Sequence, residues 1–225
     1  MAEWLVLDEA VSTQSCAAEH LDSGPSVVFA HHQTAGRGRF QREWHSRRGE
    51  SLTVSFVLRG WRGAEQPWLA GMAVALAAAE VLDVQVQWPN DLVAEGRKVG
   101  GVLTELVRGV PIVGLGVNLN QTSFPEEISD RASSMRIFRG EVLDPLAVAK
   151  AVFDEVPQRP VGWADLEARW QARDETSGKR YRQADGVEIV AVRVANGGAL
   201  IGVAEGKEST VYAADAIFGS DSSTR

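Results

Sequence analysis

The stretch His31-His32-Gln33-Thr34-Ala35-Gly36-Arg37-Gly38-Arg39-Phe40-Gln41-Arg42-Glu43-Trp44 is the most distinctive part of this 225-residue chain. It follows a short apolar run at 26–30, whose β-branched residues predict a buried strand. Five arginines and one acid lie between Gly36 and Arg48, although the formal net charge of the chain is −7. Glycine lets the backbone approach a ligand closely, and guanidinium groups are forked, permanently charged donors. The stretch therefore predicts a phosphate or carboxylate site, with a solvated hairpin loop as the alternative.

The bulk composition bounds the class of protein. Hydrophobic residues make up 44% of the chain and charged residues 24%, which is typical of a globular protein with one large domain, or one domain and a small module. The acidic balance argues against general nucleic-acid binding. The single cysteine, Cys16, excludes an intramolecular disulfide and predicts a cytoplasmic location. The N-terminus does not resemble a signal peptide, and the most apolar window, about 15 residues, is too short to cross a bilayer.

Hydrophobic periodicity and capping residues predict mixed secondary structure. Strands are expected at 4–7, 26–30, 51–58 (half-buried), 84–88, 96–106 and 110–120, and helices at 12–21, 66–81, 144–156 and 163–170. After Gly178 the composition shifts to short strands at 187–192, 199–203 and 209–212, broken by glycine pairs and typical of hairpins. We therefore predict two domains, residues 1–178 and residues 179–225.

Polar residues and glycines cluster near the ends of the central strands. Proline ends the strand before Asn90 and Asp91, although these two residue types are usual in any turn. Regular alternation would place Lys98 on the same side of the next strand as Gly100 and Val102. The strand at 110–120 also carries glycines and ends in asparagines. Two such strands side by side predict one ligand lying across the sheet.

The triplet Ser12-Thr13-Gln14 opens the first predicted helix. A hydroxyl at this place ordinarily caps the helix. Two hydroxyls and an amide in a row also present several donors to a ligand carbonyl. The pattern favours neither interpretation.

Four motifs occur in a fixed order, namely HQTAGRGRFQREW, WPNDL, KVGGVLTE and GLGVNLN. Together they resemble the biotin–protein ligases, or biotin–[acetyl-CoA-carboxylase] ligases, and the resemblance extends from Val6 to about Phe218. It implies an α+β fold, with a class II aminoacyl-tRNA synthetase-like catalytic domain built on a mixed sheet, and a small C-terminal SH3-like β-barrel. The residues before Trp4 leave no room for a winged helix-turn-helix, so the expectation is a monofunctional form. Lipoate–protein ligases share the fold, but their R-R-x-x-G-G-G-type signature is missing from the sequence.

The resemblance also implies roles for individual residues. Catalytic roles in charge stabilisation and proton transfer fall on Lys98, Arg37, Arg39 and Asp91. Substrate-binding roles fall on Ser12, Thr13, Gln14, Gln33, Gly36, Gly38, Trp44, Asn90, Gly101 and Asn118. No residue is assigned as a metal ligand, and Mg²⁺ is expected together with ATP.

The implied reaction activates biotin with ATP as biotinyl-5′-AMP and transfers it to a lysine. The implied partners are ATP, biotin and a biotin carboxyl carrier protein domain of an acyl-CoA carboxylase, without DNA or membrane and with a homodimer left open. Three positions depart from the usual family residues, with Gln87 for lysine, Gln14 for asparagine and Gln41 for glycine. The alternatives are a lipoate- or octanoate-type acyl ligase and a non-catalytic biotin-binding protein.

Overall fold

A mixed seven-stranded sheet forms the centre of the protein in a computed structural model that describes residues 2–39, 42–182 and 186–212. Gln41, one of the three departures from the family pattern, lies outside the described residues. The first two strands of the sheet are parallel and all other neighbours are antiparallel. In spatial order the strands are β1 (Trp4–Leu7), β2 (Val27–Ala30), β5 (Ser51–Val57), β9 (Val110–Asn118), β8 (Arg97–Val107), β7 (Asp91–Ala94) and β6 (Gln85–Gln87).

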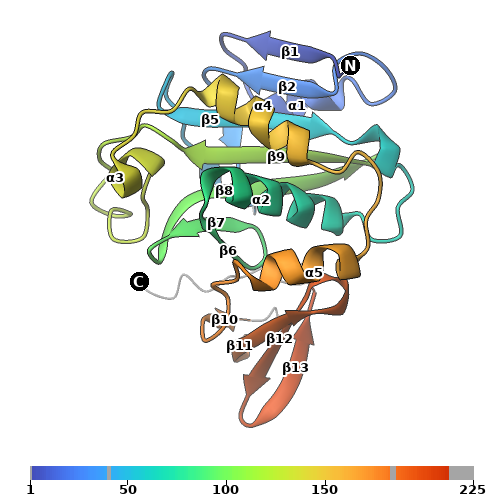
Figure 1. The fold of residues 1–225 in the computed structure, drawn as a ribbon, viewed down its shortest axis with the longest axis vertical. Coiled ribbons are helices and arrows are strands. Elements are labelled where there is room, and N and C mark those ends of the chain that lie inside the picture. Colours follow the sequence, from blue (N-terminus) through green and yellow to red (C-terminus); the bar gives the residue numbers. More distant parts are fainter. Residues whose placement is uncertain (1, 40–41, 183–185, 213–225) are drawn as a thin grey trace.

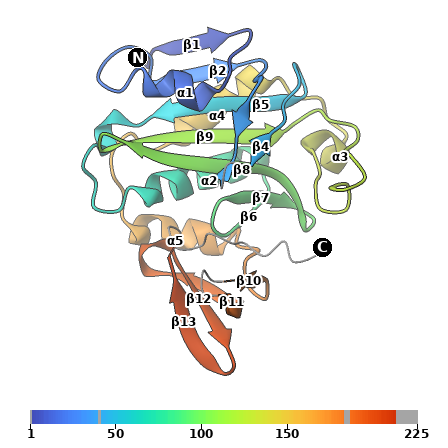
Figure 2. The same cartoon turned by 180° about the vertical axis from the view of Figure 1, so that it is seen from behind.

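Helices cover the two faces of this sheet unequally (Figures 1 and 2). Helices α2 (Trp68–Leu82) and α4 (Pro145–Glu155) lie on one face, where they pack against β5, β8 and β9. Among the described residues, the other face carries the short helix α1 (Thr13–Ala18) and a hairpin of β3 (Gly36–Arg37) and β4 (Glu43–Trp44). Helices therefore cover the second face less than the first.

The alanine-rich helix α2 lies unusually close to the sheet. Its residues from Leu69 to Ala79 are all buried, as the composition predicts for a core helix. A Cβ atom on Gly71 would lie 2.1 Å from the Oγ1 atom of Thr104 in β8. Only glycine allows this approach, so Gly71 has a packing role. No helix among the described residues is long and apolar enough to cross a membrane.

The C-terminal part forms a second, antiparallel sheet with the order β10 (Arg180–Arg182), β11 (Glu188–Ala195), β12 (Ala199–Ala204) and β13 (Lys207–Val211). Helix α5 (Trp163–Gln171) lies between this sheet and α2 (Figure 1). One hydrophobic core runs through both parts of the chain. The domain boundary at 178 stays a prediction, and so does closure of the second sheet into an SH3-like barrel.

Several elements differ from the sequence-based expectation. Helix α1 ends at Ala18, three residues earlier than predicted, and the short elements β7, β10 and α3 (Met135–Arg139) were not predicted. Strand β5 is buried along its whole length because α1 covers the face that we expected to meet solvent. Strands β3 and β4 were not predicted as strands either. The other strands, α2, α4 and α5 lie where the patterns predict them, to within a few residues at their ends.

Candidate active site

A cavity of about 1200 Å³ lies on the open face of the sheet, between the β3–β4 hairpin, the ends of β6 to β9 and the segment at 121–132. Of the fourteen residues that the resemblance points to, all but Gly36 line it. A Cβ atom on Gly36 would lie 2.4 Å from the backbone oxygen of Trp44. Glycine at this position is thus explained by the close pairing of the two hairpin strands. Its substrate-binding role stays a prediction.

The hairpin is held over the sheet by its tryptophan. The indole of Trp44 lies directly on Gly116 of β9, where an added Cβ atom would come within 2.6–2.9 Å of three ring atoms. The indole nitrogen of Trp44 is buried and has no hydrogen-bond partner among the described residues. Gly116 therefore provides the seat for the arginine loop, which means the surface on which the Trp44 indole packs, and it also leaves room for a ligand.

A buried network of uncharged polar groups forms the end of the cavity near α1. The amide oxygen of Gln33 accepts from the backbone N–H of Thr13 at 2.7 Å and lies 3.1 Å from the Thr13 hydroxyl. That hydroxyl is 2.9 Å from the Ser55 hydroxyl, which in turn donates to the amide oxygen of Gln14 at 2.9 Å. The Gln14 amide nitrogen donates to the backbone oxygen of Ile112. These contacts determine which way both glutamine amides point.

The two hydroxyl hydrogens of this network are shared among several oxygen atoms. The hydroxyl hydrogen of Ser55 is used on Gln14, whose oxygen has none to offer. Thr13 then has one hydrogen for two oxygen neighbours, Ser55 and Gln33. Each of these oxygens has a hydrogen-bond partner, but a hydroxyl or amide oxygen can accept a second hydrogen. The adjacent hydroxyl of Ser12 makes no capping hydrogen bond. The network therefore suits a ligand that donates N–H groups.

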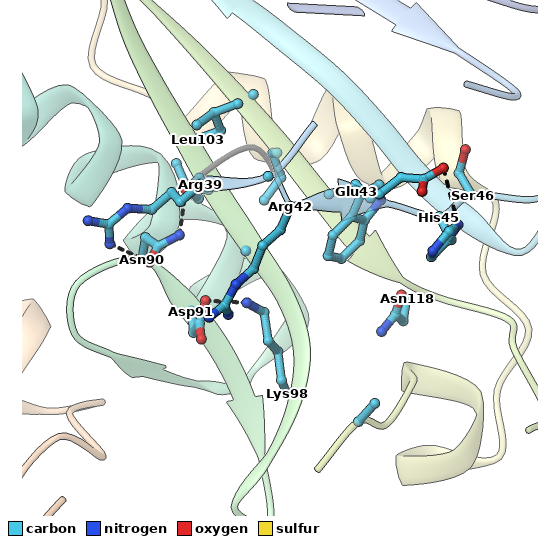
Figure 3. Close-up of a pocket in the computed structure, with 18 of the residues that line it drawn as sticks. Arg39, Arg42, Glu43, His45, Ser46, Asn90, Asp91, Lys98, Leu103 and Asn118 are labelled. Carbon is cyan, nitrogen blue, oxygen red and sulfur yellow. Dashed lines mark hydrogen bonds and ion pairs between the residues drawn. The ribbon is translucent and has the colours of Figure 1, made fainter. Parts of the chain in front are cut away.

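Cations surround a single carboxylate at the opposite end of the cavity (Figure 3). The Nζ atom of Lys98 lies 2.6 Å from the Oδ1 atom of Asp91, and both side chains are partly exposed. Arg39 donates to the Oδ1 atom of Asn90 at 3.0 Å. Arg42, which we did not single out from the sequence, also lines this region. Three cations against one carboxylate leave a positive charge that favours an anionic ligand.

Burial affects the arginines of the loop differently. Burial lowers the pKa of Arg39 below its usual value, and Asp91 partly opposes this effect. The Arg39 guanidinium still carries its charge. A bound anion would therefore offset the free energy lost when this guanidinium is partly removed from water. Arg37, in contrast, is half-exposed and pairs with Glu105 at 3.1 Å. The structure brings Arg39 to the anion end of the cavity and holds Arg37 at its rim.

A β-bulge decides which residues of β8 face the cavity. Residue pairing between β7 and β8 shifts between Leu92 and Val93, so that Val99 has no partner. A Cβ atom on Gly101 would lie 3.4 Å from the Nζ atom of Lys98, whereas one on Gly100 would meet Leu92 in the core. The expected alternation was wrong, because the bulge moves Lys98 to the face of Gly101. The glycine therefore leaves space directly beside the amine.

The segment after β9 closes a third side of the cavity. Asn118 donates to the backbone oxygen of Ser133 and accepts from Gln121 at 3.3 Å, and the Gln121 amide nitrogen also donates to Ser51. Asn118 is thus held on both sides of its amide.

Residues that line the cavity without an assigned role include Arg42, Ser46, Ser55, Leu103, Gln121 and Tyr181. Of these six, Arg42 carried a signal in the sequence as part of the arginine cluster, whereas the others required knowledge of the tertiary structure.

Comparison with known proteins places this arrangement in a family. The biotin/lipoate A/B protein ligase family matches residues 11–121. The biotin–[acetyl-CoA-carboxylase] ligase of Mycobacterium tuberculosis is 33% identical, over 80% of this chain and 74% of that protein. The bifunctional ligase/repressor BirA of Bacillus spizizenii is 35% identical over 68% of this chain, which spans only about half (52%) of its length.

Solved structures agree with these sequence relatives. The biotin protein ligase from Aquifex aeolicus in complex with biotin and ATP superimposes with a TM-score of 0.80 at 27% identity, covering 97% of this chain and 98% of that one. The similarity thus includes the central sheet and the C-terminal part. The fold, the residues around the cavity and these relatives together show that the chain belongs to the biotin/lipoate A/B protein ligase family.

Proposed function

We propose that this protein is an ATP-dependent biotin–protein ligase. It joins biotin and ATP into biotinyl-5′-AMP and then transfers the biotinyl group to a lysine of a biotin carboxyl carrier protein domain, in the cytoplasm. The observation that carries the proposal is the division of one cavity into an uncharged polar end and a cationic end. Support also comes from the names of the relatives, which are biotin ligases, and from the Aquifex aeolicus protein in complex with biotin and ATP.

The uncharged end matches the ring of biotin. A cyclic urea has two N–H donors and one carbonyl acceptor. The N–H groups would donate to the acceptor capacity that remains on the oxygens of this wall, the Thr13 hydroxyl among them. Ser12 lies in the same wall and offers a hydroxyl that does not cap α1. Satisfying buried polar groups in this way favours a urea over an apolar or carboxylic ring.

The cationic end matches the first chemical step. A carboxylate oxygen of biotin attacks the α-phosphorus of ATP, and the bond to the bridging oxygen breaks with release of pyrophosphate. Both reactants are anions, and charge increases on the phosphoryl oxygens in the transition state. Lys98 and Arg39 lie where they would reduce this repulsion. Each charge-assisted contact is worth roughly 1.5–3 kcal/mol.

The second step transfers the biotinyl group. The acceptor amine attacks the carbonyl carbon of the mixed anhydride, and AMP leaves. A free lysine amine has a pKa of about 10.4, so the acceptor must lose a proton first. Asp91 is the carboxylate nearest to the cationic groups and would accept that proton. The hairpin carrying Arg37 and Arg39 would keep water away from the anhydride until the acceptor arrives.

Mg²⁺ is the metal ion expected with ATP, and it would neutralise part of the phosphate charge. Within the described ranges no group of three or more His, Cys, Asp or Glu side chains is arranged to hold a metal ion. Mg²⁺ typically keeps several waters and binds through one or two carboxylates and the substrate phosphates. Asp91 is a side chain of the right kind, so the residues fit an ion that arrives with the nucleotide.

The direct test is incubation of the purified protein with labelled biotin, ATP and a biotin carboxyl carrier domain. We expect pyrophosphate release when biotin and ATP are present without the carrier domain. When the domain is added, we expect covalent label on its lysine. Release of pyrophosphate with lipoate or octanoate but not biotin would assign a different acid. Binding of biotin without pyrophosphate release would show a non-catalytic biotin-binding protein.

Replacing Thr13 with valine is expected to weaken biotin binding by about 10- to 50-fold. The change keeps the shape of the side chain but removes the hydroxyl that joins Gln33 and Ser55. Titration calorimetry measures the affinity. Thr53→Val is the matched control, because its buried hydroxyl donates to Ala30 and does not line the cavity. Equal weakening in both variants would contradict a direct role of Thr13.

Ligand binding is expected to slow hydrogen exchange across the arginine loop, from Thr34 to Trp44. The hairpin is short, and its two glycines lower the cost of opening. Biotinyl-5′-AMP would add contacts to Arg39 and keep the loop seated on the sheet. Exchange measured by mass spectrometry with and without biotin and ATP tests this. Identical exchange rates in both states would mean that the loop does not close over the ligand.

A further inference from the structure

The C-terminal part of the chain holds the turn that carries Asn90 and Asp91. Every hydrogen-bonding group of the preceding Trp88 is bound by a residue between 176 and 198. Its backbone N–H donates to the Thr176 hydroxyl at 2.9 Å. Its indole N–H donates to the backbone oxygen of Gly198 at 2.9 Å. Trp88 is buried and is thus fixed from outside the central sheet.

Tyr181 supplies the third contact. Its hydroxyl donates to the backbone oxygen of Trp88 at 2.9 Å, and its ring packs edge-on against the indole at 5.5 Å. Burial raises the pKa of Tyr181 far above its usual value, so the hydroxyl stays protonated and remains a donor. Gln87 partly opposes this rise in the pKa. Tyr181 lines the cavity together with Gln87, Asn90 and Asp91, so it lies beside the turn that it holds.

The carbonyl that Tyr181 binds is only two residues before Asn90. Asn90 accepts from Arg39 through its side chain, and its backbone oxygen accepts from the N–H of Val102 at 2.8 Å. Asp91 follows and pairs with Lys98. A shift of the Trp88 carbonyl would therefore change the separation between the turn and the cations of the anion site. Misplacement of about 1 Å near reacting groups is enough to slow a reaction strongly.

We propose that Tyr181 is a positioning residue for the adenylation step: its hydroxyl fixes the Trp88 carbonyl and thereby places Asn90 and Asp91 against Arg39 and Lys98. The second sheet is, on this proposal, part of the machinery that activates the acid. The inference rests on the proposed ligase function.

Tyr181→Phe tests the proposal because it removes the hydroxyl and keeps the ring against Trp88. We expect turnover in pyrophosphate release to fall about tenfold at saturating biotin and ATP. Biotin affinity should change less than twofold, because the network at Thr13 is at the other end of the cavity. Amide exchange at Val102, whose hydrogen bond goes to Asn90, should become faster in the free protein. The melting temperature should fall by no more than a few degrees.

Trp68→Phe is the matched control. Trp68 also donates from its indole to the second sheet, at the backbone oxygen of Gly197, but it does not line the cavity. Its loss should leave turnover and exchange at Val102 unchanged. Equal slowing in both variants, wild-type turnover in Tyr181→Phe, or slowing without faster exchange at Val102 would each overturn the proposal. If the wild type released no pyrophosphate with biotin, the ligase function would fail, while the exchange measurement would still decide whether Tyr181 holds the turn.

Discussion

Replacing Lys98 with alanine is expected to slow biotin adenylation by about 30- to 1000-fold, equivalent to about 2–4 kcal/mol of transition-state stabilisation. The amine lies 2.6 Å from Asp91, beside the space that Gly101 leaves open. A charge that increases on the phosphoryl oxygens would be stabilised from this point, more strongly in the transition state than in the bound substrates. Pyrophosphate release at saturating biotin and ATP measures the effect.

The folded state should tolerate this change. Lys98 and Asp91 are 43% and 28% exposed, and exposed ion pairs contribute about 0–1 kcal/mol to stability. The melting temperature should therefore shift by only a few degrees. Lys98→Arg should restore part of the rate, because the charge returns but the planar group does not fit the space of an ammonium. Adenylation by Lys98→Ala within about threefold of wild type would place the main cationic contribution elsewhere.

Replacing Gly116 with alanine is expected to weaken biotin binding by about 10- to 100-fold, although residue 116 has no side chain to contact a ligand. The added Cβ atom would lie within 2.6–2.9 Å of the Trp44 indole. Gly116 is paired on both sides in the sheet, with Thr53 and Gly101, so its backbone cannot give way. Trp44 must leave its seat, and the arginine loop would leave with it.

Two measurements separate loop displacement from general damage. Titration calorimetry gives the affinity for biotin, and hydrogen exchange should become faster from Thr34 to Trp44 in the free variant. Gly162→Ala is a matched control, because a Cβ atom there would meet only Asp165, at an ordinary 3.7 Å. Unchanged exchange across the loop in Gly116→Ala would refute the idea that Gly116 provides the seat for the arginine loop.

Much of the fold could be predicted from local patterns. Apolar periodicity located the long strands, and the helix predicted from residue 144 begins where expected, with the Oδ1 atom of Asp144 accepting from the N–H of Leu146 as a cap. The helix predicted at 66–81 is present as the buried helix α2, whose small side chains permit the close contact at Gly71. Strand β7 was not predicted, because its four residues between two turns are too few to show the alternation of apolar and polar residues that marks a strand.

The sequence by itself determined which chemical groups are present and roughly where along the chain they occur. The arginine loop, the Trp88–Asp91 turn and the glycine-bearing strands carry enough residue-level information to indicate an anion site. Only the tertiary structure decided which of these groups meet. Lys98 faces the cavity because of a bulge at Val99, and the network at Thr13 is completed by Ser55 from a different strand. Contacts between distant segments depend on strand order and register, which local periodicity does not encode.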